Sequence, residues 1–154
     1  MNQIRAKPTH YFGWRFNLYL AEQLLGTLYM SWCKQRGRFV LNETKYSLSR
    51  ERLWSGDFLL AAGQRILARA TKQRSVRRFI VGVTGRELTL EAASPFTGRF
   101  RLVEHGSVVG GVARDHLFAR KCTLDFPEDM SVPVQIFLFW LVALMWRRAG
   151  GAPC

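Results

Sequence analysis

The residue types that most often do chemistry in proteins are few here and widely separated. The chain has three histidines, His10, His105 and His116, and their spacing matches no metal-binding motif. Cys122 is near His116 in the sequence, but it falls on the apolar face of an expected strand, where a buried thiol is unreactive. These side chains therefore predict neither a metal site nor a catalytic nucleophile.

The carboxylates and glycines add no catalytic pattern. Asp125, Glu128 and Asp129 form a local acidic cluster, and we expect them to cap the start of the helix that follows, where negative charge is favoured. The glycines between 106 and 111 lack both the GxGxxG spacing and the lysine and serine of a phosphate-binding loop, so we interpret them as part of a hairpin. We predict a noncatalytic protein without a cofactor.

The cysteines and the first residues indicate the compartment. The chain has three cysteines, an odd number, and no CxxC pair, which indicates neither a disulfide framework nor a zinc site. Residues 1–10 lead into no uninterrupted apolar run, because Glu22 and Gln23 interrupt the stretch 16–33. These features predict a protein without a signal peptide in a reducing, cytoplasmic setting.

Charge is the strongest functional signal in the chain. The 154 residues include 23 Lys or Arg against 11 Asp or Glu, which gives a formal net charge of +12. A surplus of this size favours anionic partners such as phospholipid, nucleic acid or an acidic protein. The hydrophobic content of 48% is enough for one compact domain with a core.

An internal repeat indicates how this single domain is organised. Phe16, Phe58 and Phe100 are separated by a constant 42 residues, and the residues around them recur in the same register. Within each repeat, apolar and polar residues alternate over four stretches that turn residues separate, which is typical of β-strands. Three repeats of four strands predict twelve strands. The repeats cover about 1–42, 43–84 and 85–126.

The last apolar segment differs from the repeats. Residues 132–146 contain one polar residue, Gln135, so a helix here is apolar on all sides and has to be surrounded by protein or lipid. At about 1.5 Å per residue this segment is shorter than a hydrocarbon layer of roughly 30 Å. We therefore predict a mainly β fold, a closed twelve-stranded antiparallel barrel around a helix over about 131–147. Small residues that recur at the repeat interval are expected to leave room for the helix aromatics: Gly26, Ala68 and Gly110.

This architecture, together with the string CTLDFPEDMSV before the apolar helix, resembles the tubby-like superfamily, and most closely its phospholipid scramblase and LURP-one-related branch. The resemblance implies a twelve-stranded barrel around a hydrophobic helix, and binding of phosphoinositides or membranes through Lys and Arg. The segment that is acidic and proposed to bind calcium in scramblases contains Arg120 and Lys121 here. Their cysteine-rich and proline-rich segments are also missing, so neither calcium binding nor scrambling is expected.

If the strands run up and down in order, equivalent loops of the three repeats meet at one end of the barrel. Basic and aromatic loops then share one rim, where the helix also ends, and we predict that this rim binds anionic membrane lipid. The predicted headgroup-binding residues are Lys34, Arg36, Arg38, Lys72, Arg74, Arg77, Arg78, Arg120, Lys121, Arg147 and Arg148. The predicted interface aromatics are Phe12, Trp14, Trp54 and Phe96. The opposite rim is expected to be acidic, with Glu22, Glu43, Glu87, Glu128 and Asp129.

Three alternatives stay open at this point. The aromatics can cap the barrel end as core, with charges that only keep the loops solvated. The segment 58–86 holds seven basic residues and no acidic one, which suits nucleic-acid phosphates, although no RNP, KH, helix-turn-helix or zinc motif accompanies it. Residues 132–146 can also serve as a membrane anchor, which would leave the barrel lumen empty.

Overall fold

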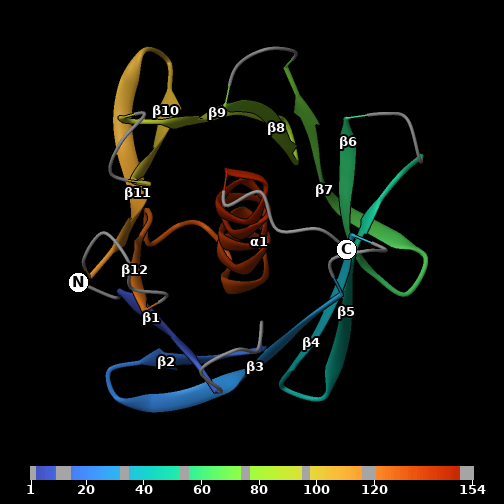
Figure 1. Ribbon diagram of the computed structural model, residues 1–154. Coiled ribbons are helices and arrows are strands. Elements are labelled where there is room, and N and C mark those ends of the chain that lie inside the picture. Colours follow the sequence, from blue (N-terminus) through green and yellow to red (C-terminus); the bar gives the residue numbers. More distant parts are fainter. Residues whose placement is uncertain are drawn as a thin grey trace.

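Twelve β-strands form a closed wall, and one α-helix fills the space inside it (Figure 1). The computed structural model describes residues 3–9, 15–31, 35–52, 56–73, 77–94, 98–115 and 121–149. The strands are β1 (Ile4–Pro8), β2 (Arg15–Leu20), β3 (Gln23–Ser31), β4 (Arg36–Leu41), β5 (Thr44–Arg50), β6 (Asp57–Ala62), β7 (Arg65–Lys72), β8 (Arg78–Val83), β9 (Arg86–Ala92), β10 (Phe100–Glu104), β11 (Ser107–Arg114) and β12 (Cys122–Asp125). The helix, α1, covers Val132–Ala149.

Each strand pairs antiparallel with its neighbours in the sequence, and the first and last strands close the sheet. Ile4 of β1 lies opposite Leu124 of β12, and Ala6 lies opposite Cys122. All four of these side chains are buried, because the alternation of a strand turns every second residue toward the lumen. The predicted fold, a mainly β closed antiparallel barrel of twelve strands with a C-terminal helix, is confirmed.

The two ends of the barrel differ in their connections. At one end, here called the hairpin rim, two-residue turns at 21–22, 42–43, 63–64, 84–85 and 105–106 join the strands. Each turn contains a residue with positive φ, such as Ala21 at 51° and Gly63 at 62°, as tight hairpins require. The opposite end, where β5, β7 and β11 finish, is here called the loop rim. Three hairpins carry a β-bulge, at Leu18/Tyr19, Leu60/Ala61 and Leu102/Val103.

The helix α1 occupies the lumen, with wall strands around it (Figure 1). The side chains of residues 136–143 are fully buried. Phe139 meets Phe16 edge-on with ring centroids 5.0 Å apart, and Trp140 meets Phe58 in the same way at 5.6 Å. A helix that is apolar on all sides is thereby surrounded by protein. Within the ranges that the structure describes, no helix is both long and apolar enough to cross a membrane.

Two of the recurring small residues make room for a neighbouring strand, not for the helix. A Cβ atom at Gly26 would lie 2.8 Å from the carbonyl oxygen of Val40 in β4, and one at Gly110 would overlap the carbonyl oxygen of Asp125 in β12. Both glycines lie beside the β-bulges of their hairpins, where the next strand approaches closely. The prediction that Gly26 and Gly110 accommodate the helix aromatics is therefore wrong.

A different wall glycine faces the helix. A Cβ atom at Gly37 in β4 would lie 3.3 Å from Nε1 of Trp140. Ala68, the third predicted small residue, is 3% exposed and belongs to the core that surrounds α1. Small residues of the wall therefore do leave room for the helix. Gly37 is one of them, although it is not among the residues predicted from the repeat.

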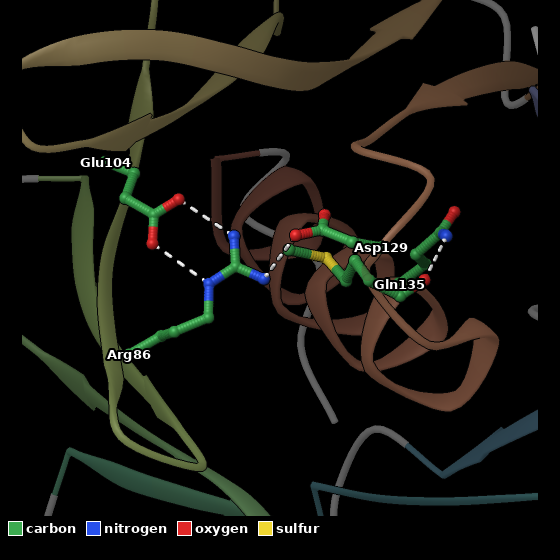
Figure 2. Close-up of polar contacts among 5 residues, drawn as sticks. Arg86, Glu104, Asp129 and Gln135 are labelled. Atoms are coloured by element: carbon green, nitrogen blue, oxygen red, sulfur yellow. Dashed lines mark hydrogen bonds and ion pairs between the residues drawn. The ribbon is translucent and has the colours of Figure 1, made fainter.

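At the hairpin rim, an arginine joins the wall to the segment before the helix (Figure 2). Arg86 donates hydrogen bonds from Nε and Nη2 to the two carboxylate oxygens of Glu104, at 2.9 and 2.8 Å. Its Nη1 lies 3.3 Å from Oδ2 of Asp129. Close by, Nε2 of Gln135 donates to the carbonyl oxygen of Met130 at 2.9 Å. These contacts hold the start of α1 against the barrel wall.

The acidic cluster does not cap α1 in the predicted way. The first turn of the helix contains no acidic residue, and Asp129 pairs with Arg86 of the wall. The backbone amide of Gln135 bonds to the carbonyl oxygen of Ser131, which places the start of the helix after the cluster. For Asp129 the capping prediction is therefore wrong, because an arginine of the wall is a stronger partner than a helix terminus.

The pair of Arg86 and Glu104 makes stability depend on pH. The hydrogen bond from Arg86 lowers the pKa of Glu104 below its ordinary value of 4.5. A lowered carboxyl pKa contributes stability above the ordinary value, and this contribution is lost as the pH falls through the pKa of the folded state. We expect Glu104→Gln to unfold more easily at neutral pH and to lose less stability than the wild type when acidified. Urea unfolding along a pH series measures this.

Glu43 provides the matched control for that experiment. It lies exposed in the turn between β4 and β5, so Glu43→Gln changes the charge equally and should leave the pH profile of the wild type intact. Parallel pH profiles for Glu104→Gln and the wild type would show that the Arg86 pair contributes nothing to stability.

Candidate anion-binding site at the loop rim

Three cationic side chains end their strands on the inner side of the wall. Arg50 follows the buried Leu48 by two residues at the end of β5, and Lys72 follows the buried Ala70 in the same way at the end of β7. Arg114 ends β11 two residues after a buried valine. Because alternate residues of a strand share a face, all three side chains point toward the mouth of the barrel.

The end of the helix adds further cations to this mouth. α1 runs from the hairpin rim to the loop rim, where Arg147 and Arg148 form part of its last turn. Nε1 of Trp146 donates a hydrogen bond to the carbonyl oxygen of Gly98 at 2.7 Å, which fixes the helix end against the segment before β10. Cations at a helix C-terminus are favoured by about 0.3–1 kcal/mol, so this placement also suits the helix itself.

The charges in the mouth act on one another. Burial, and then the charge of Arg50, lower the pKa of Arg148. Burial, and then the charge of Arg148, lower the pKa of Lys72. Desolvation and a like charge both disfavour a cation, so the charged forms of Lys72 and Arg148 are held at an energetic disadvantage. We call Arg50, Lys72 and Arg148 the mouth cluster.

Arg114 has a different role beside the mouth cluster. Its Cζ lies 4.1 Å from the centroid of the Trp146 ring, which is a cation–π contact, and burial lowers its pKa. Arg114 lies opposite Cys122 in the sheet. Burial raises the pKa of the Cys122 thiol, which disfavours the reactive thiolate.

The structure unites only some of the predicted site residues. Lys72 and Arg148 meet in the mouth cluster, and Arg147, the residue before Arg148 in the helix, is half-buried. Other cations of the prediction project from the outer wall or lie exposed at the rim: Arg36, Arg38, Arg77, Arg78 and Lys121. Arg78 lies 3.7 Å from a carboxylate oxygen of Glu91. The remaining predicted site residues lie outside the described residues: Lys34, Arg74, Arg120, Phe12, Trp14, Trp54 and Phe96.

The sequence reasoning missed Arg50 and Arg114 because it grouped whole loops by composition. The signal that could have found them is strand parity, that is, whether a residue shares the inward or the outward face of its strand. Arg50 has the parity of the apolar Leu48, and Arg114 lies 42 residues after Lys72, at the equivalent position of the next repeat. Parity separates cations that enter the lumen from those on the outer wall.

Metal-ligating side chains do not gather into a second site among the described residues. Over the described part of the chain, no group of three His, Cys, Asp or Glu side chains lies in a position to hold a metal ion. Comparison with protein-family models, with curated proteins and with solved structures finds no match. The mouth cluster therefore has to be interpreted from its own geometry and charge.

Proposed function

We propose that this protein is a noncatalytic, cytoplasmic module that binds the headgroups of anionic phospholipids through the loop rim. The observation that carries this proposal is the mouth cluster. Burial and, after it, a like charge within the cluster lower the pKa values of Lys72 and Arg148, and a phosphate among the three cations would offset that unfavourable interaction. The resemblance to the tubby-like superfamily supports the same class of ligand.

The position of the cluster favours a membrane over a small soluble anion. It lies at one end of a barrel, where a flat anionic surface perpendicular to the barrel axis would face the strand ends that carry Arg50 and Lys72. Cations near such a surface contribute roughly 1 kcal/mol each, which makes three of them a useful source of affinity. The aromatics predicted for this rim would then settle at the interface, as aromatic residues do at membrane surfaces.

Neutralising the mouth cluster tests the proposal. We expect the triple variant Arg50→Gln/Lys72→Gln/Arg148→Gln to bind anionic vesicles roughly 100-fold more weakly than the wild type, because it removes about 1 kcal/mol for each cation. Sedimentation with phosphatidylserine-containing vesicles at physiological salt measures the change. Vesicles of neutral lipid are expected to bind neither protein.

A matched triple variant separates the cluster from overall charge. Arg65, Arg69 and Arg101 are exposed and lie outside the mouth cluster, on β7 and β10, so their replacement by glutamine removes the same formal charge. This control should bind anionic vesicles almost as tightly as the wild type. Equal losses of binding in the two triple variants would show that only the overall charge of the protein matters, and not the mouth cluster. Equal binding of neutral and anionic vesicles would refute the proposed binding of anionic headgroups.

A further inference from the structure

The outer wall of β2 to β5 carries cations and an aromatic side chain in one row. Arg15 lies opposite Tyr29, Tyr29 lies opposite Arg38, and Arg38 lies opposite Ser47, in four successive strands. Tyr29 is 38% exposed. The guanidinium carbons of Arg15 and Arg38 lie 4.7 and 5.1 Å from the centre of its ring. The row therefore presents a tyrosine held between two arginines.

This row borders a groove of about 510 Å³. Val40 and Lys45, a cross-strand pair next to the row, line it together with Tyr29 and Arg38. Gly63, in the turn between β6 and β7, lines its other side. In Figure 1 this part of the wall is the region of β3, β4 and β5. The volume is in the range of small-ligand sites, and the lining combines apolar, aromatic and cationic groups.

Carboxylates balance many cations elsewhere on the barrel but not those of this face. Arg5 pairs with Asp115, Arg69 with Glu51, and Arg101 with Glu91, at distances from 2.7 to 3.1 Å. Arg38 and Lys45 line the groove, and Arg15 and Arg36 lie on β2 and β4 of the same face. Of the residues that the structure places, no acidic side chain forms such a pair with these four cations. The positive charge of this face is therefore open to an anionic ligand.

The same comparison argues against the segment first considered for nucleic acid. In residues 58–86, Arg69, Arg78 and Arg86 all pair with carboxylates. A run of basic residues in the sequence is therefore no guide to which cations lack a carboxylate partner. Among the described residues, the four cations of the β2 to β5 face lack one.

We propose that this face binds single-stranded nucleic acid, with phosphates along the arginines and a base in the groove against the exposed edge of Tyr29. Proteins that bind single strands combine a positively charged groove with aromatic side chains on which bases stack. A concave groove beside an aromatic ring suits an unpaired base better than a flat bilayer, and stacked bases of a duplex cannot enter it. Contacts to phosphates and to the face or edge of a ring are common to all four bases, so the binding is expected to tolerate different sequences. The site lies on the outer wall, apart from the mouth cluster, and the proposal is independent of membrane binding.

Fluorescence anisotropy with a labelled oligothymidylate of about twelve nucleotides tests the proposal, at roughly 0.15 M salt. We expect Tyr29→Ala and Arg38→Ser each to weaken binding about tenfold, through the lost aromatic contact and the lost phosphate contact. The full set of four cations predicts that the logarithm of affinity falls with the logarithm of salt with a slope of about −3. Arg38→Ser should make this slope shallower by about 0.7.

Arg101→Ser is the matched control, because it removes the same charge from the outer wall of β10. It should bind the oligonucleotide like the wild type, and a duplex of the same length should bind the wild type more weakly. The proposal is overturned if the single strand does not bind at this salt concentration, if Arg101→Ser weakens binding as much as Arg38→Ser, or if the duplex binds equally well. It is also overturned if Tyr29→Ala and Arg38→Ser retain the oligonucleotide and lose anionic vesicles instead, since the face would then contact lipid.

Discussion

Replacing Trp140 by alanine is expected to lower the free energy of unfolding by about 3–5 kcal/mol. The side chain is fully buried at the centre of α1, edge-on to Phe58 of the wall and stacked near Phe137 of the helix, with ring centroids 5.6 and 6.3 Å apart. Truncation removes the transfer energy of the indole and leaves a cavity that a closed sheet cannot collapse to fill. Urea unfolding followed by far-ultraviolet circular dichroism measures the loss.

Two variants define how that result should be interpreted. Tyr29→Ala removes an aromatic ring from the outer wall and should change stability by about 1 kcal/mol or less, so a similar value for Trp140→Ala would contradict a helix packed in the lumen. Trp140→Phe keeps most of the ring and removes a buried indole N–H for which the structure places no partner. It should therefore be milder, at less than about 1.5 kcal/mol.

The barrel was predictable because its physical signals are local and repeated. Alternation along β5 places Leu48 inside the wall, and the same alternation holds in strands 42 residues away. The apolar character of α1 on all sides required protein or lipid around it, and twelve strands that close on themselves supply the protein. The limits of the three repeats stay a prediction, although the bulges at Leu18/Tyr19, Leu60/Ala61 and Leu102/Val103 recur at the repeat interval.

The contacts between segments distant in the sequence could not be predicted in the same way. Asp129 was predicted to cap the helix because the sequence shows only that it lies just before the helix. Its actual partner, Arg86, is 43 residues away, and the sequence does not show that the two residues meet. Gly26 was predicted to leave room for the helix, but it lies beside a β-bulge, and β4 approaches it there. For the site, the alternation of residues along β5 was enough to place Arg50 on the inner face of the wall. Arg50 was missed because the loops were compared only by their composition.

Replacing Gly110 by alanine is expected to lower the free energy of unfolding by about 1–3 kcal/mol, or by more if the wall cannot adjust. A Cβ atom there would overlap the carbonyl oxygen of Asp125 and would lie 3.1 Å from Cα of Phe126. Both are backbone atoms, one in the last residue of β12 and one in the residue after it, so no flexible side chain can move aside. The shift would reach the strand that closes the barrel against β1.

Gly82→Ala shows whether space or backbone freedom makes glycine necessary at such positions. Gly82 also lies within a strand and also lacks a positive φ, but the nearest atom to its Cβ would be the carbonyl oxygen of Arg69 at 3.9 Å, an ordinary contact. Any general effect of replacing a strand glycine is shared by both variants, and alanine at a compatible site tends to stabilise by about 0.4–1 kcal/mol. The difference between the two unfolding free energies therefore isolates the close approach of β11 and β12. Equal values would mean that this part of the barrel is looser than the register of its strands indicates.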